Sequence, residues 1–395
     1  MASPRRPGRG LDVGRPSTDL SRNRFHVLCK KNGPRRKVPA QSRHLFRSPA
    51  RHARHPKPSC RSGQKRLCGS LPGRKGFLPC RPSSFGQIPQ NSIRKTQIDC
   101  CSSTMIIVRI MGGLGNQMFQ YAAGRRLAAI HNTVLKLDIS DFKNYTLHDY
   151  GLSAFNIQEA IATQEEIQLF KEPDTRSLQK KIKKLLGFPN KLGITHIRES
   201  QYHFDPAILT MHDSVYLDGY WQSEKYFSDI SGIIRNEFTV TLPQTGKNLA
   251  LAQQMASCES ISLHVRRGDY VTDEKTNTIH GTCDLDYYAR CIEHLSHTIH
   301  HPYFFIFSDD PDWAEKNLRI THPVTFINHN GPKKNYEDLR LMSQCKHHII
   351  ANSSFSWWGA WLNRYPDKLV LSPERWFKEK DFNTKDLIPA TWQRL

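Results

Sequence analysis

Short apolar runs alternate with amphipathic stretches along residues 105–395. The run MIIVRIM at 105–111 is followed by a helix-like stretch, NQMFQYAAGRRLAAIHN, at 116–132 and by a second apolar run, TVLKLDIS, at 133–140. This order predicts strand, helix and strand, which is the beginning of a βαβ unit with parallel strands. Helices in such units cover the faces of a sheet, so the pattern indicates an α/β protein.

The middle of the chain is less regular, with a basic and partly amphipathic helix predicted at 165–188 and a polar linker containing Pro and Gly at 238–248. The alternation then returns, with strands predicted at 260–265, 303–308, 324–328, 347–351 and 368–372 and helices at 284–299, 311–318, 335–345 and 353–363. We therefore expect two doubly wound α/β domains, residues 105–245 and 246–395. Ligands should bind beyond the carboxyl ends of their strands, in a cleft between the two domains.

The positive charge of the chain is concentrated in its first 104 residues. This leader holds 24 of the 57 Lys and Arg residues and 3 of the 36 Asp and Glu residues, so the remainder carries 33 of each sign. The leader also contains 12 of the 23 prolines and shows no sustained apolar period. Residues 1–104 are therefore predicted to be a disordered basic leader that builds no core.

Three origins of the leader stay open. Its composition, rich in Arg and Ser and poor in acids, is typical of an organellar transit peptide. A stretch translated from a wrong upstream start would look the same, and we favour this reading because Met105 directly precedes the first apolar run. A nucleic-acid-binding arm is the third reading, but few aromatic residues are present to stack on bases, so no nucleic-acid partner is expected.

The remaining composition narrows the class of protein. No stretch of 18 apolar residues occurs, so no transmembrane helix is predicted, and the leader has no apolar segment suited to a secretory signal. The four cysteines after the leader have no C-x-x-C spacing; they are Cys258, Cys283, Cys291 and Cys345. Reduced cysteines in a cytoplasmic protein are expected, without zinc or a disulfide framework.

The stretch GGLGNQ lies between the first predicted strand and helix. Glycines at such a turn let backbone N–H groups come close to an anion, and the helix N-terminus adds partial positive charge. A tight strand-to-helix turn explains the same residues without a ligand, because the stretch matches neither of the two common phosphate-loop patterns. Asn116 and Gln117 favour a ligand, since polar amides at this turn would face the cleft.

The stretch LHVRRGDYV follows the strand predicted at 260–265. His264, Arg266, Arg267 and Asp269 therefore lie at the sheet edge where doubly wound sheets bind ligands. An arginine there can hold a phosphate with two parallel hydrogen bonds and keeps its charge when water is removed. The alternative is a surface loop with a solvated pair of Arg and Asp.

Two further strand ends carry polar residues. In FSDDPDW, Asp310 before Pro311 is predicted to cap a helix, which leaves Asp309 as a ligand candidate and makes a metal site through Asp310 and Asp312 less favoured. In ANSSFSWWGAWLN, the hydroxyls and N–H groups of Ser353 and Ser354 begin a helix and could bind an anion. Phe355 could flank a flat ring, and at least two of the three tryptophans that follow are expected in the core.

In this order and spacing, MGGLGNQMFQYAAGRRLA, HVRRGDYV, SDDPDWAEKNL and NSSFSWWGAWLN resemble glycosyltransferase family 11, the α-1,2-fucosyltransferases, in their bacterial form. The resemblance covers about residues 105–395. It implies a GT-B architecture, with two Rossmann-like domains around a cleft, the first on the acceptor side and the second binding the donor. It also implies metal-independent, inverting transfer of L-fucose from GDP-fucose to the 2-hydroxyl of a galactose residue, with no cofactor.

By that resemblance, Arg266 grips the donor diphosphate, His264 is its companion in the nucleotide pocket, and Asp309 is a candidate for the guanine. Two loops complete the expected donor site: Ser353, Ser354 and Phe355 line the GDP, and Gly115, Asn116 and Gln117 lie beside the phosphates. Arg266 can stabilise the charge that develops on the leaving GDP without a metal. Asp269 is a candidate for the general base, although an Asp beside two arginines can simply orient them.

The acceptor cannot be read from the residues, since its binding loops would fall in the divergent region of about 140–245. A galactose-terminated oligosaccharide or lipid-linked glycan is expected, used by a cytoplasmic enzyme with peripheral contact to the inner membrane. The basic stretch KKIKKLLGF at 180–188 could touch anionic headgroups, or it could be a solvated helix face. A fucosyltransferase with another acceptor and a nucleotide- or glycan-binding module without turnover stay open as alternatives.

Overall fold

The structure is a computed structural model that describes residues 104–144, 147–171 and 194–395. The predictions for the leader, for the helix beyond Lys171 and for the basic stretch at 180–188 lie outside the described residues. We call residues 104–245 the first half and residues 246–395 the second half. The domain boundary between residues 245 and 246 stays a prediction.

A four-stranded parallel sheet organises the first half. Its strands are β1 (Met105–Arg109), β2 (Val134–Asp138), β3 (Thr195–Arg198) and β4 (Ser214–Asp218), in the order β2-β1-β4-β3. The predicted unit of β1, α1 (Leu114–His131) and β2 is confirmed. The sequence pattern missed β3 and β4, because short strands among polar loops leave too few residues to establish a period of two.

Both faces of the first sheet are covered, as a parallel sheet requires. Ile106 and Val108 of β1 join the core that contains α1, while Ile107, which points to the opposite face, packs with Ile167 of α2 (Gln164–Lys171). This alternation follows from the two-residue period of a strand. Further helical segments of the first half are α4 (Ser231–Glu237) and the 3-10 helices at Ser140–Lys143, Leu152–Ala154, Pro206–Thr210, Glu224–Tyr226 and Ser228–Ile230.

A six-stranded parallel sheet organises the second half, with strand order β10-β9-β8-β5-β6-β7. Counted from β5, this is the order 3-2-1-4-5-6 of the doubly wound nucleotide-binding fold. The five predicted strands are confirmed and a short β10 is added: β5 (Glu259–Val265), β6 (Pro302–Ser308), β7 (Val324–Ile327), β8 (His347–Ile349), β9 (Val370–Ser372) and β10 (Gln393–Arg394).

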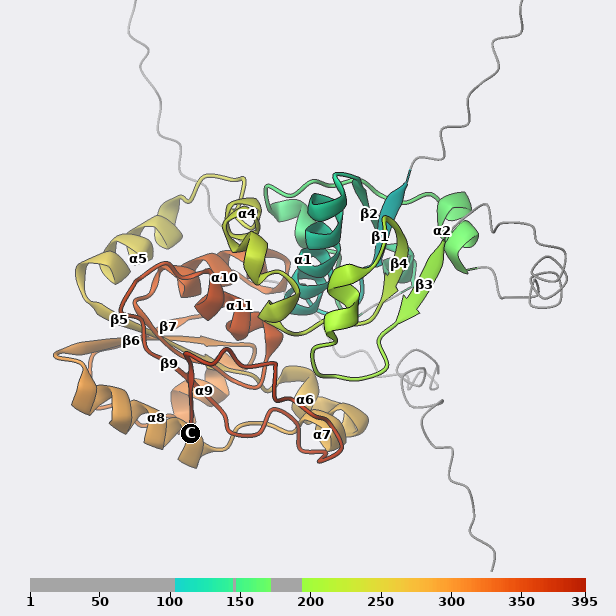
Figure 1. The fold of residues 1–395 in the computed structure, drawn as a ribbon. Coiled ribbons are helices and arrows are strands. Elements are labelled where there is room, and N and C mark those ends of the chain that lie inside the picture. The colour runs from blue at the N-terminus through green and yellow to red at the C-terminus, as the bar shows by residue number, and fades with distance from the viewer. Residues whose placement is uncertain (1–103, 145–146, 172–193) are drawn as a thin grey trace, which may run out of the picture. The chain divides into compact units, whose positions relative to one another are not determined.

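Helices cover both faces of the second sheet. One apolar cluster joins β5 to α8 (Leu285–Thr298) and α9 (Pro311–Asn317), and another joins β6 to α5 (Gly246–Ser257) and α10 (Asn335–Gln344) (Figure 1). The remaining helical segments of this half are α6 (Gly268–Thr272), α7 (Glu274–His280), α11 (Ser354–Leu362) and a 3-10 helix at Pro332–Lys334. The predicted linker at 238–248 is shorter than expected, because α5 already begins at Gly246.

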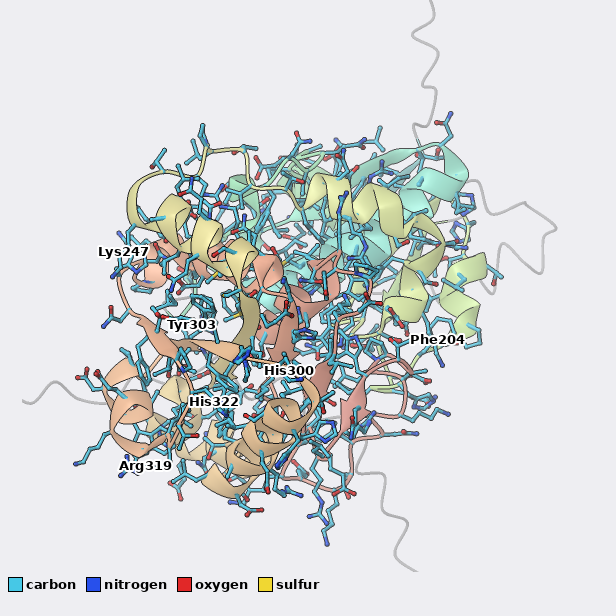
Figure 2. All side chains as sticks on the ribbon, turned by 90° about the vertical axis from the view of Figure 1, so that its left-hand side faces the viewer. Phe204, Lys247, His300, Tyr303, Arg319 and His322 are labelled. Carbon is cyan, nitrogen blue, oxygen red and sulfur yellow. The ribbon has the colours of Figure 1, made fainter. Side chains whose placement is uncertain are left out.

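Figure 2 shows the side chains of the described residues, with Phe204 in the first half and Tyr303, Arg319 and His322 in the second. The described cysteines Cys258, Cys283, Cys291 and Cys345 are free thiols. None of the helices described here is long and apolar enough to cross a membrane.

Helices α1 and α11 lie side by side and join the two halves (Figure 1). The ring of Phe119 on α1 lies 4.5 Å from Trp357 and 4.9 Å from Trp358 on α11, measured between ring centroids. The indole N–H of Trp358 donates to the carbonyl oxygen of Gly115 across 2.9 Å. Trp357, Trp358 and Trp361 are all buried, which confirms that they belong to the core.

Candidate donor site between two sheet edges

The order of strands reverses between β5 and β8, which are neighbours in the second sheet. The chain leaves β5 toward β6 on one side and leaves β8 toward β9 on the other. Ligands of doubly wound folds bind outside the carboxyl ends of the strands at such a point. Arg266 directly follows β5, and Ser353 lies in the short segment between β8 and α11. The topology therefore brings two motifs that are distant in the sequence to one edge of the sheet.

Arg266 is held by two carboxylates. Its Nη2 donates to Oδ1 of Asp269 at 2.5 Å, and its Nη1 forms an ion pair with Oδ2 of Asp309 at 2.9 Å. The guanidinium carbon lies 5.3 Å from the ring centroid of Tyr270. Burial opposes the charge of Arg266, but the two carboxylates outweigh it and raise the pKa of the guanidinium. Asp269 thus orients Arg266, while its candidacy as the general base stays a prediction.

Asp309 forms an ion pair with the same arginine, Arg266. Besides its pair with Arg266, its Oδ1 accepts a hydrogen bond of 2.8 Å from the backbone N–H of Arg267. A Cβ built on Gly268 would lie 2.5 Å from Oδ2 of Asp309, so a side chain at position 268 would displace this carboxylate. The expected contact of Asp309 with guanine stays a prediction, while the geometry gives this carboxylate a role in holding Arg266.

Asp310 caps a helix, as predicted. Its carboxylate accepts from the backbone N–H of Trp313 at 3.3 Å at the N-terminus of α9, where Pro311 occupies the first turn. The same carboxylate accepts from Nε of Arg267, whose guanidinium lies 3.8 Å from the ring centroid of Trp313. Within the described ranges, no three His, Cys, Asp or Glu side chains are grouped as metal ligands would be.

His264 is buried at the end of β5, with 5% of its surface exposed. Its ring centroid lies 5.7 Å from that of Phe355, and among the described residues its Nδ1 has no hydrogen-bond partner. Burial lowers the pKa of His264 to about 4, with Asp309 opposing and Arg266 adding to this effect. The imidazole is therefore neutral at pH 7 and has a buried nitrogen available to a ligand.

Ser353 and Ser354 begin α11 but have different partners. The Ser353 hydroxyl caps the helix by accepting from the N–H of Phe355 at 3.3 Å. The Ser354 hydroxyl donates to Oδ1 of Asn116, which also accepts from Nε2 of Gln222 at 2.8 Å. The first turn of α11 therefore faces the glycine loop of the first half, which is the stretch GGLGNQ at 112–117. The N–H groups of this turn contribute positive potential there.

The glycine loop packs closely against the start of α11. A Cβ built on Gly115 would lie 2.4 Å from the backbone carbon of Ser354, so α11 occupies the space that a side chain would need. Gly112 has a φ of +75°, a conformation that favours glycine. The backbone of α11 accounts for the absence of a side chain at Gly115, and the predicted contact of Gly115 with the donor diphosphate stays a prediction.

The side chain of Gln117 is bonded to backbone groups of the protein. Its side chain is fully buried, donates from Nε2 to the carbonyls of Gly112 and Asp149, and accepts at Oε1 from the N–H of Gly151, each at 2.9 Å. These hydrogen bonds of the side-chain amide thus all go to backbone groups of two loops. The contact of Gln117 with the donor stays a prediction, while these bonds give its side chain a role in holding the second loop.

Sequence reasoning missed two histidines near Arg266. His280 stacks on Tyr270, with ring centroids 4.8 Å apart and planes inclined by 14°, and burial lowers the pKa of His280 to about 4. His148 comes from the first half and interacts electrostatically with Arg266 and Asp269. Both histidines lie outside the four motifs, so the sequence contained no signal for them. Their neighbour Tyr270 does belong to a motif, the stretch LHVRRGDYV.

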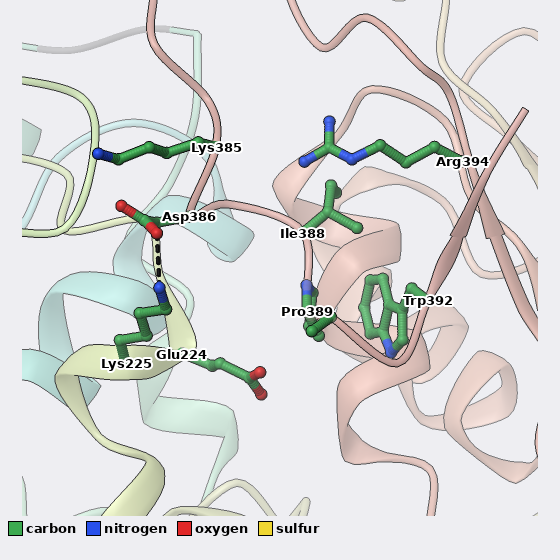
Figure 3. A pocket seen from close by; sticks show the side chains of 9 residues that line it. Glu224, Lys225, Lys385, Asp386, Ile388, Pro389, Trp392 and Arg394 are labelled. Carbon is green, nitrogen blue, oxygen red and sulfur yellow. Dashed lines mark hydrogen bonds and ion pairs between the residues drawn. The ribbon is translucent and has the colours of Figure 1, made fainter.

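A cavity of about 340 Å³ lies apart from these residues (Figure 3). An ion pair of 2.6 Å between Lys225 and Asp386 crosses its wall, and Arg394 and Trp392 line the opposite side. None of the residues expected to bind the donor lines this cavity. It is therefore distinct from the candidate donor site.

Comparison with known proteins places this arrangement in a family. The family model described as glycosyl transferase family 11 matches residues 86–393, which overlaps the end of the predicted leader. An alpha-1,2-colitosyltransferase of Escherichia coli is 37% identical over 300 residues, covering 74% of this chain and 99% of that protein. The O-antigen biosynthesis glycosyltransferase WbnK of Escherichia coli is 31% identical over 302 residues, covering 72% and 99%.

An animal protein is also similar over a shorter stretch. The galactoside 2-alpha-L-fucosyltransferase SEC1 of Bos taurus is 28% identical over 170 residues, covering 42% of this chain and 45% of that protein. The two parallel-sheet halves agree with the GT-B architecture that the resemblance implied. With the family model matching most of its length and near-complete coverage of two bacterial relatives, the chain belongs to glycosyltransferase family 11 and is a glycosyltransferase.

Proposed function

We propose that this glycosyltransferase moves L-fucose from GDP-fucose to the 2-hydroxyl of a galactose residue in a glycan, with inversion at the anomeric carbon. Family membership and the similarity to a galactoside 2-alpha-L-fucosyltransferase support this assignment. The observation that carries it is the position of Arg266 at the carboxyl end of β5, beside the N-terminus of α11 and at the reversal of strand order.

In this proposal Arg266 binds the diphosphate of the donor. Asp269 and Asp309 engage its Nη2 and Nη1 and so fix the plane of the guanidinium before the donor arrives. Among the contacts of the described residues, these pairs leave N–H groups of the fork for phosphate oxygens. The positive end of α11 adds to the attraction, since a helix of nine residues presents free N–H groups at its first turn.

The nucleotide would lie along β5 and the start of α11. His264 offers its unpartnered Nδ1, and Phe355 offers a ring close to it. Ser354 contributes its backbone N–H, because the hydroxyls of Ser353 and Ser354 are occupied by the helix cap and by Asn116 and the N–H of Ser353 donates to the carbonyl of Ala351 at 2.8 Å. Gly115 and Asn116 therefore shape the site from behind, through α11, instead of touching the donor.

Transfer breaks the bond between the fucose anomeric carbon and the diphosphate oxygen, so negative charge grows on GDP while the sugar becomes oxocarbenium-like. Arg266 stabilises that charge more in the transition state than in the ground state, which lowers the barrier. Because a fixed cation is already at the leaving group, this proposal needs neither a metal nor a cofactor.

GDP-colitose is a second candidate donor, favoured by the identity of 37% with an alpha-1,2-colitosyltransferase. Colitose differs from L-fucose by the absence of one ring hydroxyl, so the same nucleotide pocket would serve both donors. A glycan acceptor is common to both readings. A peptide or chitin-type oligosaccharide is the remaining acceptor class to compare.

The test incubates the full-length protein with GDP-fucose or GDP-colitose and lactose, and measures GDP release together with the linkage and anomeric configuration of the product by NMR. GDP affinity is measured by calorimetry for the wild type, for Arg266→Lys and for Arg267→Lys, which makes the same charge-conserving change at the neighbouring position. Arg266→Lys should weaken GDP binding at least 10-fold, about 1.4 kcal/mol, because lysine lacks the planar fork, whereas Arg267→Lys should bind within about 3-fold of wild type.

Release of GDP with lactose and a new β-to-α inverted linkage at the 2-hydroxyl would support the proposal. Faster turnover of GDP-colitose would move the assignment to that donor. GDP binding without transfer to lactose, to a peptide or to chitin oligosaccharides would indicate a binding module. Failure of the wild type to bind GDP would contradict the donor site itself.

A further inference from the structure

Tyr202, a half-buried residue that follows β3 in the first half, begins two series of side-chain contacts. Its hydroxyl begins a series of hydrogen bonds that ends at Ser354, in the first turn of α11. Its ring begins a series of ring contacts that ends at Arg266. These are the two elements to which the proposed function assigns the phosphates of the donor.

The hydrogen-bonded series runs through two side-chain amides. The hydroxyl of Tyr202 donates to Oε1 of Gln222, and burial raises the pKa of this hydroxyl, so it keeps its proton. Nε2 of Gln222 donates to Oδ1 of Asn116 at 2.8 Å, and the same oxygen accepts from the hydroxyl of Ser354 at 2.6 Å. Because Tyr202 occupies the amide oxygen of Gln222, the amide nitrogen is left to bond Asn116. The first bond therefore sets the direction of the second.

The loop at 219–223 holds Gln222 in one conformation. Trp221 has a φ of +55°, which is rare for a bulky side chain. The carboxylate of Glu199 accepts from the N–H of Trp221 at 3.1 Å and from that of the residue before it at 2.6 Å. The N–H of Ser223 donates to the carbonyl of Trp221 at 2.8 Å and closes a tight turn around Gln222. Backbone strain of this kind persists only where the surroundings enforce it, and it is concentrated at functional sites.

The series of ring contacts crosses from the first half to the second. The ring centroid of Tyr202 lies 4.9 Å from that of Phe377, and Phe377 lies 5.1 Å from His280. His280 stacks on Tyr270 at 4.8 Å, and the ring of Tyr270 lies 5.3 Å from the guanidinium carbon of Arg266. Removal of a ring from a close-packed interior leaves a space into which its neighbours relax. The ring of Tyr202 therefore supports the groups that lie against Arg266.

We propose that Tyr202 is a positioning residue for the donor, which holds Arg266 and the first turn of α11 at the spacing that a diphosphate requires. This inference rests on the proposed function. Arg266 and the N–H of Ser354 come from segments that are separate in the sequence, so the fold has to fix the distance between them. Two groups that bind one ligand give the greater affinity when they are already in place, since ordering them during binding costs free energy.

The experiment measures GDP affinity by calorimetry in the full-length protein. Tyr202→Phe removes the hydroxyl and keeps the ring, whereas Tyr202→Ala removes both. Tyr303→Phe is the matched control, because the Tyr303 hydroxyl bonds to that of Thr325 at 3.0 Å near the start of β6, at the edge of the second sheet opposite Arg266 (Figure 2). Thermal unfolding is recorded for each variant, and binding is measured at a temperature at which that variant is folded.

Tyr202→Phe should weaken GDP binding about 3- to 10-fold, which is the effect of one hydrogen bond. The KM for the donor should rise by a similar factor, while the KM for the acceptor should stay within about 2-fold of wild type. Tyr202→Ala should lose more GDP affinity, because the ring contacts toward Arg266 are opened as well. Tyr303→Phe should bind GDP within about 2-fold of wild type, although it loses an equivalent hydrogen bond.

A double variant separates positioning from a general weakening of the fold. Ser354→Ala removes the last hydroxyl of the hydrogen-bonded series. If Tyr202 acts on α11 through Ser354, Tyr202→Phe combined with Ser354→Ala should weaken GDP binding by less than the product of the two single effects. A loss of stability alone produces no such coupling in the GDP affinity of the folded protein.

GDP binding by Tyr202→Phe within about 2-fold of wild type would overturn the proposal. Fully multiplicative effects of Tyr202→Phe and Ser354→Ala would overturn it as well, and so would an equal loss of affinity in Tyr303→Phe. In these cases the wild type still binds GDP, so the donor site of the proposed function stands. A wild type that binds no GDP would instead overturn the proposed function and this inference with it.

Discussion

The hydroxyl of Ser354 donates a hydrogen bond of 2.6 Å to Oδ1 of Asn116, across 238 residues of sequence. The same junction contains the bond from the Trp358 indole to the carbonyl of Gly115. Two motifs that each suggest a nucleotide loop are therefore in direct contact with one another. These contacts hold the two halves in register.

Gly115→Ala should destabilise the protein by about 1–3 kcal/mol, because the new Cβ would meet the backbone of Ser354 and force the two helices apart. Gly232→Ala is the matched control. No atom lies within 4 Å of its added Cβ, and it should gain up to about 1 kcal/mol from helix propensity. Urea unfolding of the two variants measures the difference. Equal stabilities would show that α1 and α11 are not packed as described.

Gln117→Ala should cost about 1–3 kcal/mol in unfolding free energy and should loosen the loop at 149–151. The reason is that the backbone N–H of Gly151 and the carbonyls of Gly112 and Asp149 lose their partner in a buried place. Hydrogen exchange at the amide of Gly151 should accelerate. Gln168→Ala, at an exposed position of α2, should leave that amide as slow as in wild type.

Asp218 should make stability depend on acid pH. Burial opposes its ionisation, but hydrogen bonds from His196 and Arg109 outweigh burial and hold the pKa of Asp218 well below its usual range. A lowered folded pKa stabilises the protein above the unfolded pKa of about 3.9, and this contribution is lost as pH falls below it. Asp218→Asn should therefore lose about 1.5–3 kcal/mol at pH 7 and should show a weaker decline on acidification.

Urea unfolding at pH 7, 5 and 3.5 would measure this dependence. The control is Asp286→Asn, which removes an exposed pair with Arg290 on α8 and should change stability by no more than about 0.5 kcal/mol. If Asp218→Asn and wild type declined in parallel on acidification, the ion pairs at the end of β4 would have no such role.

Transfer activity should survive treatment with EDTA within about 2-fold. Arg266 already provides the positive charge at the proposed leaving group, and Asp309 and Asp310 are occupied by arginines and by the cap of α9. GDP release with lactose is measured before and after EDTA, and again after adding Mg²⁺ or Mn²⁺. A loss of 10-fold or more that a divalent ion restores would contradict the metal-free mechanism.

The local pattern of apolar and polar residues was sufficient to predict most strands and helices of the second half. The strands β5 to β9 are apolar runs bounded by polar residues, and the helices between them carry apolar residues on one face, so a window of a few residues contains the signal. The capping of α9 by Asp310 was likewise readable, since Pro311 follows it directly. The strands β3 and β4 lacked such a signal, because β3 (THIR) contains a single apolar residue and the apolar run of β4 (SVYLD) is three residues long between polar ones.

By itself, the sequence determined the α/β class, the family resemblance and the strand ends where His264, Arg266 and Ser353 lie, because each depends on residues that are neighbours along the chain. Only the tertiary structure decided that Gln117 is buried, that Asn116 bonds to α11 and that Asp309 pairs with Arg266. These relationships arise when the strands of each sheet come together and the two sheets pack through α1 and α11. No local period records such packing, since it depends on the shapes of both surfaces at once.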